Sequence, residues 1–420
     1  MELNVVTLNC WGLPFGVSKH RSERMQHIAK ELASGAYDIV SLQEIWVMED
    51  YQLIKSTVEK VLPHSFYFRM GMLHGGLCIF SKWPIIDTFY HPYSLNGYAH
   101  KVTMADWYIS KMVALCKLDV EGMTVNVYNT HAHALYAPSN IPEKDEFLTH
   151  RLTQLYELSE FVRLTSGAAD LVLVTGDFNS EPFSLATKLA VSNARLLDAW
   201  ETRENKEYTD GMTNERLGNP LAEGQTLFYM NTDNGERIDY IFYQSFGPYT
   251  AKCLKTTLAL QKIPGMDLHY SDHEGVLSTI YVTLAKDTQG RGDDVSDENS
   301  NQEEDGSPWQ HLPDHLKEAI LHLSSNIEKV KSDQKWCLVR ALFFFTLLLL
   351  SLSLGSVSQV LAFVWTCGMT LLTAFYLGFG IVAKECEKKT LTGIMEGMKV
   401  RLSVVENRTT VNGEPGGKHI

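Results

Sequence analysis

Short apolar runs rich in Val, Ile and aromatic residues alternate with segments of helical periodicity through the first two thirds of the chain. The runs predict strands at Val5–Leu8, Asp38–Leu42, Leu77–Phe80, Met112–Leu118, Thr124–Tyr128, Leu171–Val174, Ile238–Phe242 and Val276–Val282. Helical spacing is found at Met25, Ile28, Ala29 and Leu32, and again at Leu148, Leu152, Leu155, Leu158 and Phe161. Because strands outnumber helices and some follow each other directly, the pattern predicts an α/β sandwich of mixed sheets over residues 1–284.

The pattern of apolar positions changes at residue 285. Residues 285–309 are rich in Asp, Glu, Asn, Gly and Ser and contain almost no apolar side chains, which predicts a flexible linker. Residues 310–334 carry a single apolar stripe, formed by Leu316, Ile320, Leu323, Ile327 and Val330. This spacing predicts an amphipathic helix that either lies on a membrane surface or docks on the main domain.

Two apolar runs follow, Ala341–Leu354 and Val360–Val382, and the second contains no charged residue. Their lengths predict a hairpin of two transmembrane helices within residues 336–383, with Arg340 reaching the interface. One membrane span beside a buried hydrophobic helix is the alternative. Two pairs of small residues four positions apart, Ser351/Gly355 and Ala374/Gly378, are compatible with oligomerisation through these helices.

Positively charged residues flank both sides of the predicted hairpin. The positive-inside rule therefore places the main domain and the tail at residues 384–420 together in the cytosol, so that the chain is an integral membrane protein with both ends on one side. Asn407 begins a glycosylation sequon, and this topology predicts that it stays unmodified.

The net charge of −13 bears on whether the chain binds nucleic acid. The predicted linker contributes −6 to this net charge, and no stripe of basic residues is visible elsewhere in the sequence. Since proteins that grip a nucleic-acid backbone carry a basic excess, the balance argues against a nucleic-acid partner. The seven cysteines are scattered and form no CxxC pair, which indicates neither a zinc site nor a disulfide framework. The first residues read as a strand and not as a signal peptide.

Residues that can bind a metal ion or move a proton follow the predicted strands. They are Asn9, Glu44, His131, Asp177, Asn179, Asp239, Asp272 and His273. A carboxylate or imidazole after an apolar strand is costly unless it has a partner, and strand ends at one edge of a sheet converge. Carboxylates with an Asn amide suit Mg²⁺ or Mn²⁺ better than Zn²⁺. Together these groups predict hydrolysis of a phosphate ester, although each motif alone also fits a solvated strand end or a turn.

The order of these motifs resembles the endonuclease/exonuclease/phosphatase superfamily, the DNase I-like fold, across roughly Met1–Leu284. The matching motifs are Leu8-Asn9-Cys10-Trp11, Leu42-Gln43-Glu44-Ile45, Thr175-Gly176-Asp177-Phe178-Asn179, Arg237-Ile238-Asp239-Tyr240 and Ser271-Asp272-His273-Glu274, with Asn129-Thr130-His131 between the second and third. The resemblance implies a four-layer α/β sandwich, in which two packed mixed sheets are flanked by helices.

The resemblance also implies a metal site. Glu44 would be the principal ligand of Mg²⁺, for which Mn²⁺ could substitute, and Asn9 would help to shape the metal and phosphate site. Asp272 would lie close to the metal. Asp177 and Asn179 would position the nucleophilic water and the phosphate.

Two histidines would carry the catalytic protons in this resemblance. His273 would be the general base, oriented by Asp239, and would take the proton as a metal-oriented water attacks in line. His131 would hold a phosphate oxygen or help the leaving group. The acidic partner that some members place behind the first histidine is not identifiable in this sequence.

Within the superfamily the chain is most similar to the neutral sphingomyelinases. The signals include Ser18-Lys19-His20-Arg21, Gly76-Leu77-Cys78-Ile79-Phe80-Ser81-Lys82, Leu95-Asn96-Gly97-Tyr98 and the transmembrane pair. This similarity implies hydrolysis of sphingomyelin to ceramide and phosphocholine in the endoplasmic reticulum, with lysophosphatidylcholine as a further substrate. Asp106 and Lys111 resemble an Asp/Lys pair beside the active site of these enzymes, where the lysine could contact the phosphate. A solvated loop and strand entry is the other interpretation of this pair.

Three alternatives stay open at this point. A nuclease on the same fold predicts a basic groove and no membrane pair, and an inositol polyphosphate 5-phosphatase predicts a Cys-Asp-Arg motif where this chain has Arg237-Ile238-Asp239-Tyr240. A catalytically inactive membrane adaptor predicts replaced catalytic positions, yet all the expected residue types are present. No Ser or Cys stands in a recognisable nucleophile elbow, which favours direct attack by water.

Overall fold

The computed structural model describes residues 1–71, 75–101, 106–136, 145–206, 211–214, 219, 221, 235–284, 308–352 and 358–412. The chain divides into two compact units, Met1–Leu312 and Pro313–Ile420. Most of the predicted linker, residues 285–307, lies outside the described residues. Its last two residues begin a short 3₁₀ helix, η3 (Pro308–His311).

The first sheet of unit one has the strand order β11-β12-β1-β2-β4-β3. Its strands are β1 (Glu2–Asn9), β2 (Ile39–Gln43), β3 (His64–Phe68), β4 (Leu77–Ser81), β11 (Tyr249–Ala259) and β12 (Gly275–Leu284). β1 and β2 are parallel, and the other neighbours are antiparallel. The first strand of the chain therefore lies inside the sheet, beside the last strand of the unit.

The second sheet has the order β5-β6-β7-β8-β10-β9. Its strands are β5 (Ile85–Pro92), β6 (Met112–Val120), β7 (Met123–His131), β8 (Leu171–Asp177), β9 (Leu197–Asp198) and β10 (Asp239–Ser245). β7 and β8 are parallel, with His131 opposite Asp177. β10 runs antiparallel to β8 and begins with Asp239, also opposite Asp177. Three functional candidates thus meet at one end of this sheet.

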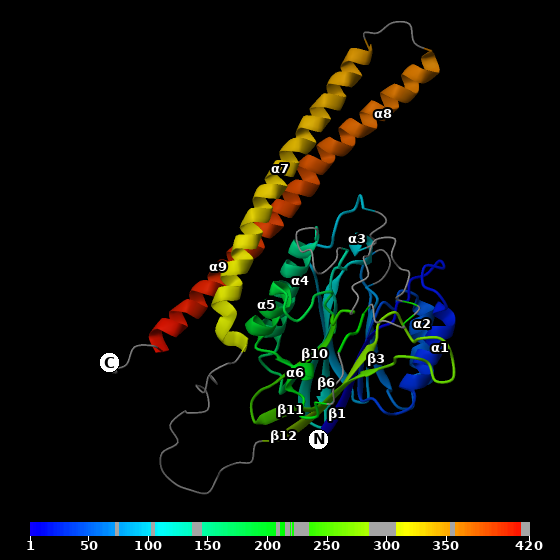
Figure 1. Ribbon diagram of the computed structural model, residues 1–420, viewed down its shortest axis with the longest axis vertical. Coiled ribbons are helices and arrows are strands. Elements are labelled where there is room, and N and C mark those ends of the chain that lie inside the picture. Colours follow the sequence, from blue (N-terminus) through cyan, green and yellow to red (C-terminus); the bar gives the residue numbers. More distant parts are fainter. Residues whose placement is uncertain are drawn as a thin grey trace. The chain divides into compact units, whose positions relative to one another are not determined.

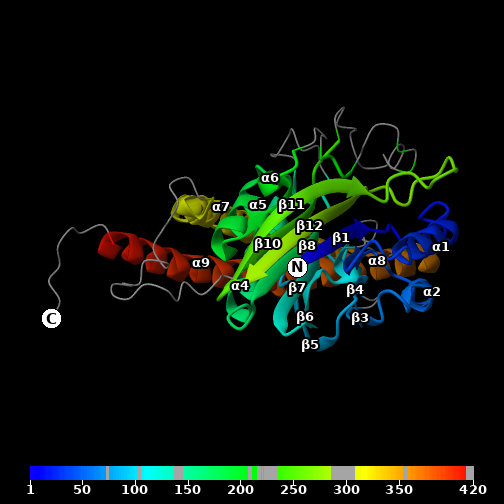
Figure 2. The ribbon, with the colours of Figure 1, turned by 90° about the horizontal axis from the view of Figure 1, so that it is seen from below.

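Alternation of side chains along the strands builds the layers. Leu3 and Val5 of β1 belong to the apolar cluster between the two sheets, whereas Val6 and Leu8 belong to the cluster beneath α1 and α2. Figures 1 and 2 show α1 and α2 on one side of the paired sheets and α4 and α5 on the other. The helices are α1 (Arg21–Leu32), α2 (Met48–Val58), α4 (Leu148–Thr165), α5 (Leu185–Ala194) and the short α6 (Ala199–Thr202). The predicted two-sheet α/β architecture is confirmed.

The sequence pattern missed four strands, β3, β5, β9 and β11. β5 has no buried residue, and in β11 only Cys253 and Thr256 are buried, so neither contains a continuous apolar run. β9 has only two residues. A search for apolar runs therefore misses edge strands that have one solvent-exposed face, but it finds the strands inside the sheets.

Unit two is a helical hairpin formed by α7 (Leu312–Leu352), α8 (Gln359–Gly378), a π-helical turn η4 (Phe379–Ala383) and α9 (Lys384–Asn412). The predicted amphipathic segment and first apolar run form one continuous helix, and the predicted tail is helical as far as Asn412. Phe344 of α7 stacks on Tyr376 of α8, with ring centroids 5.6 Å apart. Lys317 pairs with Glu406 at 2.8 Å, so α9 returns alongside α7.

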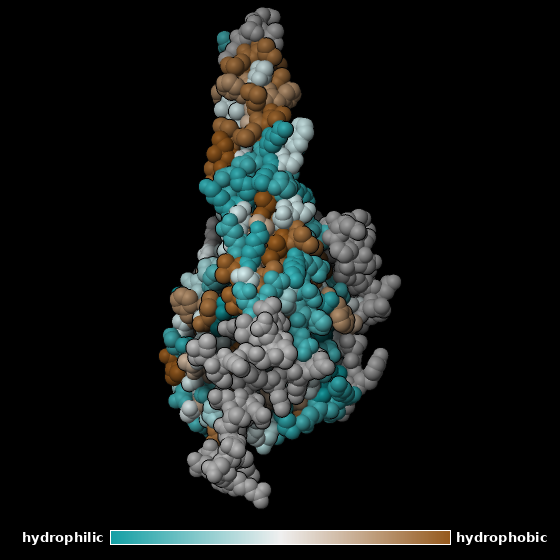
Figure 3. Space-filling model, turned by 90° about the vertical axis from the view of Figure 1, so that its left-hand side faces the viewer, coloured by the Kyte–Doolittle hydropathy of each residue, from teal (hydrophilic) through white to brown (hydrophobic). Residues whose placement is uncertain are grey.

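Two helical segments, Trp309–Ser351 and Gln359–Asn407, contain stretches long and apolar enough to cross a membrane. Large apolar side chains on them are exposed, including Leu342 and Phe343 on α7 and Leu361 and Phe363 on α8. In Figure 3 hydrophobic side chains cover the upper part of the hairpin, and hydrophilic ones form a band directly below. This distribution is typical of a segment that enters a bilayer and ends at its polar surface.

Candidate active site

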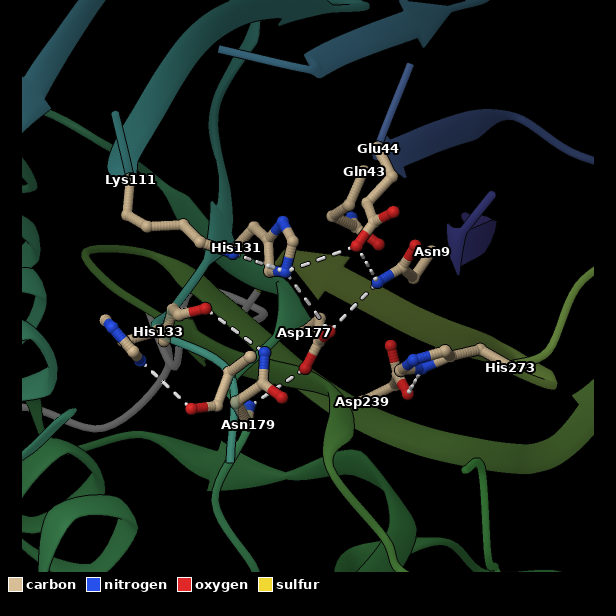
Figure 4. Close-up of polar contacts among 12 residues, drawn as sticks. Asn9, Gln43, Glu44, Lys111, His131, His133, Asp177, Asn179, Asp239 and His273 are labelled. Atoms are coloured by element: carbon tan, nitrogen blue, oxygen red, sulfur yellow. Dashed lines mark hydrogen bonds and ion pairs between the residues drawn. The ribbon is translucent and has the colours of Figure 1, made fainter. Parts of the chain in front are cut away.

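The candidate active site lies where the parallel pairs β1/β2 and β7/β8 end. Asn9 connects the two sheets, because its Nδ2 donates to Oδ2 of Asp177 at 3.0 Å and approaches Oε1 of Glu44 at 3.3 Å (Figure 4). His131 Nε2 lies 3.7 Å from Glu44 Oε1 and 3.6 Å from Asp177 Oδ2. The structure therefore brings together residues that the sequence separates by up to 168 positions.

Glu44 follows β2 directly and has a positive φ of 57°. This left-handed conformation costs roughly 1–2 kcal/mol for a residue with a Cβ, so the surrounding contacts must hold it. The Gly12 N–H donates to the Glu44 carbonyl at 3.0 Å, and Trp46 Nε1 donates to Glu44 Oε2 at 3.3 Å. Burial and the nearby charge of Asp272 raise the pKa of Glu44. This carboxylate is thus aimed into the site, where a cation would stabilise its charged form.

Asp177 and Asn179 share a turn after β8. The Asn179 N–H donates to Asp177 Oδ1 at 2.8 Å, and Asn179 Nδ2 donates to the carbonyl of Ala132 at 3.1 Å. A Cβ at Gly176 would lie 2.1 Å from the carbonyl oxygen of Thr130, which explains the glycine before Asp177. Burial and the charge of Asp239 raise the pKa of Asp177 to about 7.

His273 and Asp239 form a buried pair. His273 Nδ1 lies 2.8 Å from Asp239 Oδ2, which leaves Nε2 as the ring nitrogen available to another group. The backbone of Asp239 is held as well, because its N–H donates to Thr213 Oγ1 at 3.2 Å. Burial alone would lower the pKa of His273, but Asp239, Asp177 and Asp272 together raise it well above its ordinary value. This geometry orients an imidazole as a general base needs.

Lys111, just before β6, is the cation next to His131. Its Nζ lies 2.7 Å from His131 Nε2 and 3.3 Å from Asp106 Oδ1, and both partners are buried. Burial and the lysine charge lower the pKa of His131 well below its ordinary value. Burial would raise the pKa of Asp106 in the short helix α3 (Asp106–Ile109), but His133 and Lys111 pull it below its usual range. The Asp/Lys pair is therefore a buried part of the site and not a solvated loop.

The acid behind His131 is also absent from the described residues, since His131 Nδ1 is buried there without a hydrogen-bond partner. With Nε2 facing an ammonium group, the imidazole is an acceptor at that nitrogen. His131 consequently suits a neutral role in contact with the substrate better than a role as proton donor in this arrangement.

A metal ion fits the donor set of the site. Asp177, Asp239 and His273 each offer a ligand atom, and these atoms lie within 4.8 Å of one another. Asp239 Oδ1 is buried and has no hydrogen-bond partner among the described residues. Carboxylates with raised pKa values, such as the half-buried Glu44 and the buried Asp177, are what a divalent cation would stabilise. These three residues differ from the ligands that the sequence predicts.

The predicted ligands Glu44, Asn9 and Asp272 have different surroundings. Asn9 Oδ1 accepts from the Trp11 N–H at 3.0 Å, so the amide directs its nitrogen and not its oxygen towards the carboxylates. Asp272 Oδ1 lies 3.0 Å from Ser271 Oγ, and Asp272 is close enough to Glu44 to raise the pKa of Glu44. Among the three, Glu44 and Asp272 keep carboxylate oxygens that could bind a cation.

Sequence reasoning missed the residues that hold the site in place. Arg24 is fully buried and donates to the carbonyls of Cys10, Trp11, Lys19 and Tyr270 at 2.7–3.0 Å. Gln43 Nε2 donates to Asn129 Oδ1 at 2.7 Å and so joins the two sheets beneath the site. An arginine inside an apolar helical stripe was the available signal for Arg24, since such a residue must find partners when it is buried.

Comparison with known proteins adds a family and several relatives. The endonuclease/exonuclease/phosphatase family model matches residues 6–273. A putative neutral sphingomyelinase of Drosophila melanogaster is 38% identical over 288 residues, which cover 67% of this chain and 61% of that protein. A putative neutral sphingomyelinase of Caenorhabditis elegans is 32% identical over 413 residues, which cover 95% of this chain and 90% of that protein. The match thus spans less than two thirds of the Drosophila relative's length.

Among solved structures, that of TDP2 from Caenorhabditis elegans is similar in fold. It is 21% identical, its TM-score is 0.50, and the match covers 67% of this chain and 75% of that one. At this identity the similarity supports the fold of the first unit.

Proposed function

This chain belongs to the endonuclease/exonuclease/phosphatase family, and from that premise we propose that it is a sphingomyelin phosphodiesterase of the phospholipase C type. The observation that carries the proposal is the His273–Asp239 pair, which shares one site with Asp177, Asn9 and Glu44 at the end of both sheets. The names of the two sphingomyelinase relatives supply the substrate class. The products would be ceramide and phosphocholine, and lysophosphatidylcholine would be a second substrate.

In the proposed reaction, side chains of this protein take the proton of the attacking water and orient the phosphate. Water attacks the phosphorus in line as His273 takes its proton. The bond between phosphorus and the ceramide oxygen breaks, and that oxygen leaves with the bonding electron pair and takes a proton from solvent. Asp239 holds the imidazole through Nδ1, so that Nε2 faces the water. Amide and ammonium donors of Asn179 and Lys111 would bind phosphate oxygens. Mg²⁺, or Mn²⁺ in its place, would neutralise negative charge on the phosphate when bound.

The test of this function is headgroup release in detergent. Full-length protein is incubated with sphingomyelin or lysophosphatidylcholine, in Mg²⁺ or in EDTA. Mg²⁺-dependent release of phosphocholine supports the proposal, and the ratio of rates ranks the two lipids. If folded protein released headgroup from neither lipid, the lipase function would be wrong. Nucleic acid, phosphoinositides and the inactive-adaptor hypothesis would then be tested next.

Lys111 is expected to matter for turnover. Its buried ammonium group lies beside His131 and Asp106, where a phosphate oxygen could accept from it. Lys111→Ala should therefore lower the turnover of micellar substrate by about 10²-fold, the usual effect of removing one such donor. Lys117→Ala is the matched control, because Lys117 lies on the adjoining strand β6 and its side chain is 31% exposed. Normal turnover by Lys111→Ala would contradict this role.

Metal binding is expected to strengthen with pH. The pKa of Asp177 is raised to about 7 in the metal-free site, and that of Glu44 is also raised. At about pH 6 a cation must displace a proton from Asp177, whereas at about pH 8 the carboxylate is already ionised. Mg²⁺ titration calorimetry should therefore show higher affinity at the higher pH, with proton release at the lower one. If Mg²⁺ affinity were the same at both pH values, Asp177 would not lose a proton when the cation binds, and this prediction would be wrong.

We also propose that the hairpin anchors the protein in the endoplasmic reticulum with both ends cytosolic. The long apolar helices and their flanking lysines support this arrangement. Ala374 and Gly378, four residues apart on α8, offer a close-packing face for a second copy. On this topology Asn407 should carry no glycan, and peptide-N-glycosidase treatment should leave the electrophoretic mobility of protein from cells unchanged. If the enzyme shifted the mobility of the wild type but not that of Asn407→Gln, Asn407 would carry a glycan and the proposed orientation would be wrong.

A further inference from the structure

Two phenylalanines project from the active-site edge of the first unit into solvent. Phe15 is 95% exposed and Phe183 is 84% exposed, the highest values among the large hydrophobic side chains of the described residues. Single exposed apolar side chains are ordinary on protein surfaces. These two, however, stand at equivalent places, each six residues after a strand-end residue of the site, Asn9 or Asp177.

Each phenylalanine occupies a tight turn. In the first, the Val17 N–H donates to the Pro14 carbonyl at 3.3 Å, and in the second the Ser184 N–H donates to the Glu181 carbonyl at 3.1 Å. Phe15 has a φ of 62°, a conformation that favours glycine or asparagine and strains a bulky residue. A strained phenylalanine that gains no burial within its own chain indicates a contact outside it.

The turn that carries Phe15 is fixed to the site and not loosely attached. Arg24 donates to the carbonyls of Trp11 and Lys19, so one guanidinium group holds both ends of the loop between them. The N–H of Gly12, within the same loop, donates to the Glu44 carbonyl at 3.0 Å. Phe15 is therefore held at a defined position relative to Glu44.

Two more apolar side chains extend this surface. Val17 is 60% exposed in the first turn, and Trp107 is 47% exposed directly beside the buried Asp106. Lys19 is exposed next to the first turn. Aromatic side chains with a neighbouring lysine are the composition that settles at a lipid–water interface.

We infer that Phe15 and Phe183, with Val17 and Trp107, form an interfacial surface that inserts into the headgroup layer of a bilayer and places the mouth of the site on the lipid. The inference rests on the proposed function, since a lipid substrate requires the site to reach a membrane. It goes beyond anchoring by the hairpin, because tethering alone does not orient the site. A lipid surface suits four separated apolar tips better than a folded protein partner would, since it needs no complementary shape.

The test uses full-length protein in nanodiscs of phosphatidylcholine, in EDTA so that no turnover occurs. A fluorophore that brightens in apolar surroundings is attached to Phe15→Cys or to Phe183→Cys, in a background in which the two exposed cysteines, Cys367 and Cys386, are replaced by serine. Leu164→Cys is the matched control. Leu164 is 70% exposed but lies at the end of α4, near the start of β8 in the chain and hence at the opposite edge of the sheet.

Spin-labelled lipid should quench the fluorophore at positions 15 and 183 and leave that at 164 unchanged. Equal quenching at all three positions, or none, would overturn the inference, as would a signal that depends on protein concentration and not on lipid. A second measurement uses the Phe15→Ser/Phe183→Ser double variant. Its hydrolysis of sphingomyelin in vesicles should fall by about tenfold or more, while turnover of a soluble short-chain substrate stays unchanged. If the wild type hydrolysed neither lipid, the proposed function would be wrong, but the quenching would still show whether this surface inserts into the bilayer.

Discussion

Replacing His273 by alanine is expected to lower the turnover number by about 10²–10⁴-fold, the range that general base catalysis contributes. His273 is 8% exposed, and Asp239 at 2.8 Å fixes its orientation. Alanine removes the imidazole nitrogen that would take the proton from water. Phosphocholine release from sphingomyelin at saturating Mg²⁺ measures the loss directly.

The control for this experiment is His91→Ala, which removes a surface histidine paired with Glu157 and should leave turnover unchanged. Asp239→Asn tests the orientation of His273 separately, because an amide can hold the ring in the wrong tautomer while the shape is kept. Near-ultraviolet circular dichroism shows whether each variant is folded. A folded His273→Ala protein with undiminished turnover would exclude His273 as the general base.

Replacing Glu44 by glutamine should abolish Mg²⁺-dependent turnover. The carboxylate lies at the centre of the site, 3.3 Å from the amide nitrogen of Asn9, and burial and Asp272 raise its pKa. Glutamine keeps the shape and the hydrogen bond from Trp46 but removes the charge that would bind a cation. We expect Mg²⁺ affinity to fall by more than about 100-fold, beyond the usual effect of altering a group behind the ligands.

Calorimetric titration with Mg²⁺ measures this loss without reference to activity. Glu49→Gln is the matched control, since Glu49 is an exposed residue in the first turn of α2. If Glu44→Gln kept full affinity but lost turnover, the metal would be held by Asp177, Asp239 and His273, and Glu44 would act on the substrate.

The central strands and the convergence of the site were predictable from the sequence. A strand inside a sheet and buried on both faces appears as an unbroken apolar run, as in β8, and a polar group at its end must find a partner. The apolar runs that end at Glu44 and Asp177, and the run that begins beside Asp239, therefore indicated that these three carboxylates lie in one site. Edge strands such as β11 could not be found in this way, because their pattern is mixed.

The detailed roles within the site could not be predicted. Which way the Asn9 amide points depends on the Trp11 N–H, and that contact follows from the turn after β1. The resemblance placed Lys111 beside the active site, but its contact with His131, 20 residues further along the chain, is set by the fold. The apolar stripe signals that Arg24 is buried, but its partners could not be predicted, since they are carbonyl groups of loops and every residue type has a carbonyl.

The pairing of β1 with β12 has a consequence for how the protein is made. Residues 2–7 pair with residues 276–281, and Ser271 Oγ donates to the Asn9 carbonyl across 262 positions of chain at 2.6 Å. β1 is synthesised before β12 and therefore waits for it, and contacts of such long range form slowly. Since Asn9 and His273 lie at these two ends, catalytic competence arises only when synthesis of the unit is complete. On the proposed function, this topology would keep a nascent chain from hydrolysing lipid.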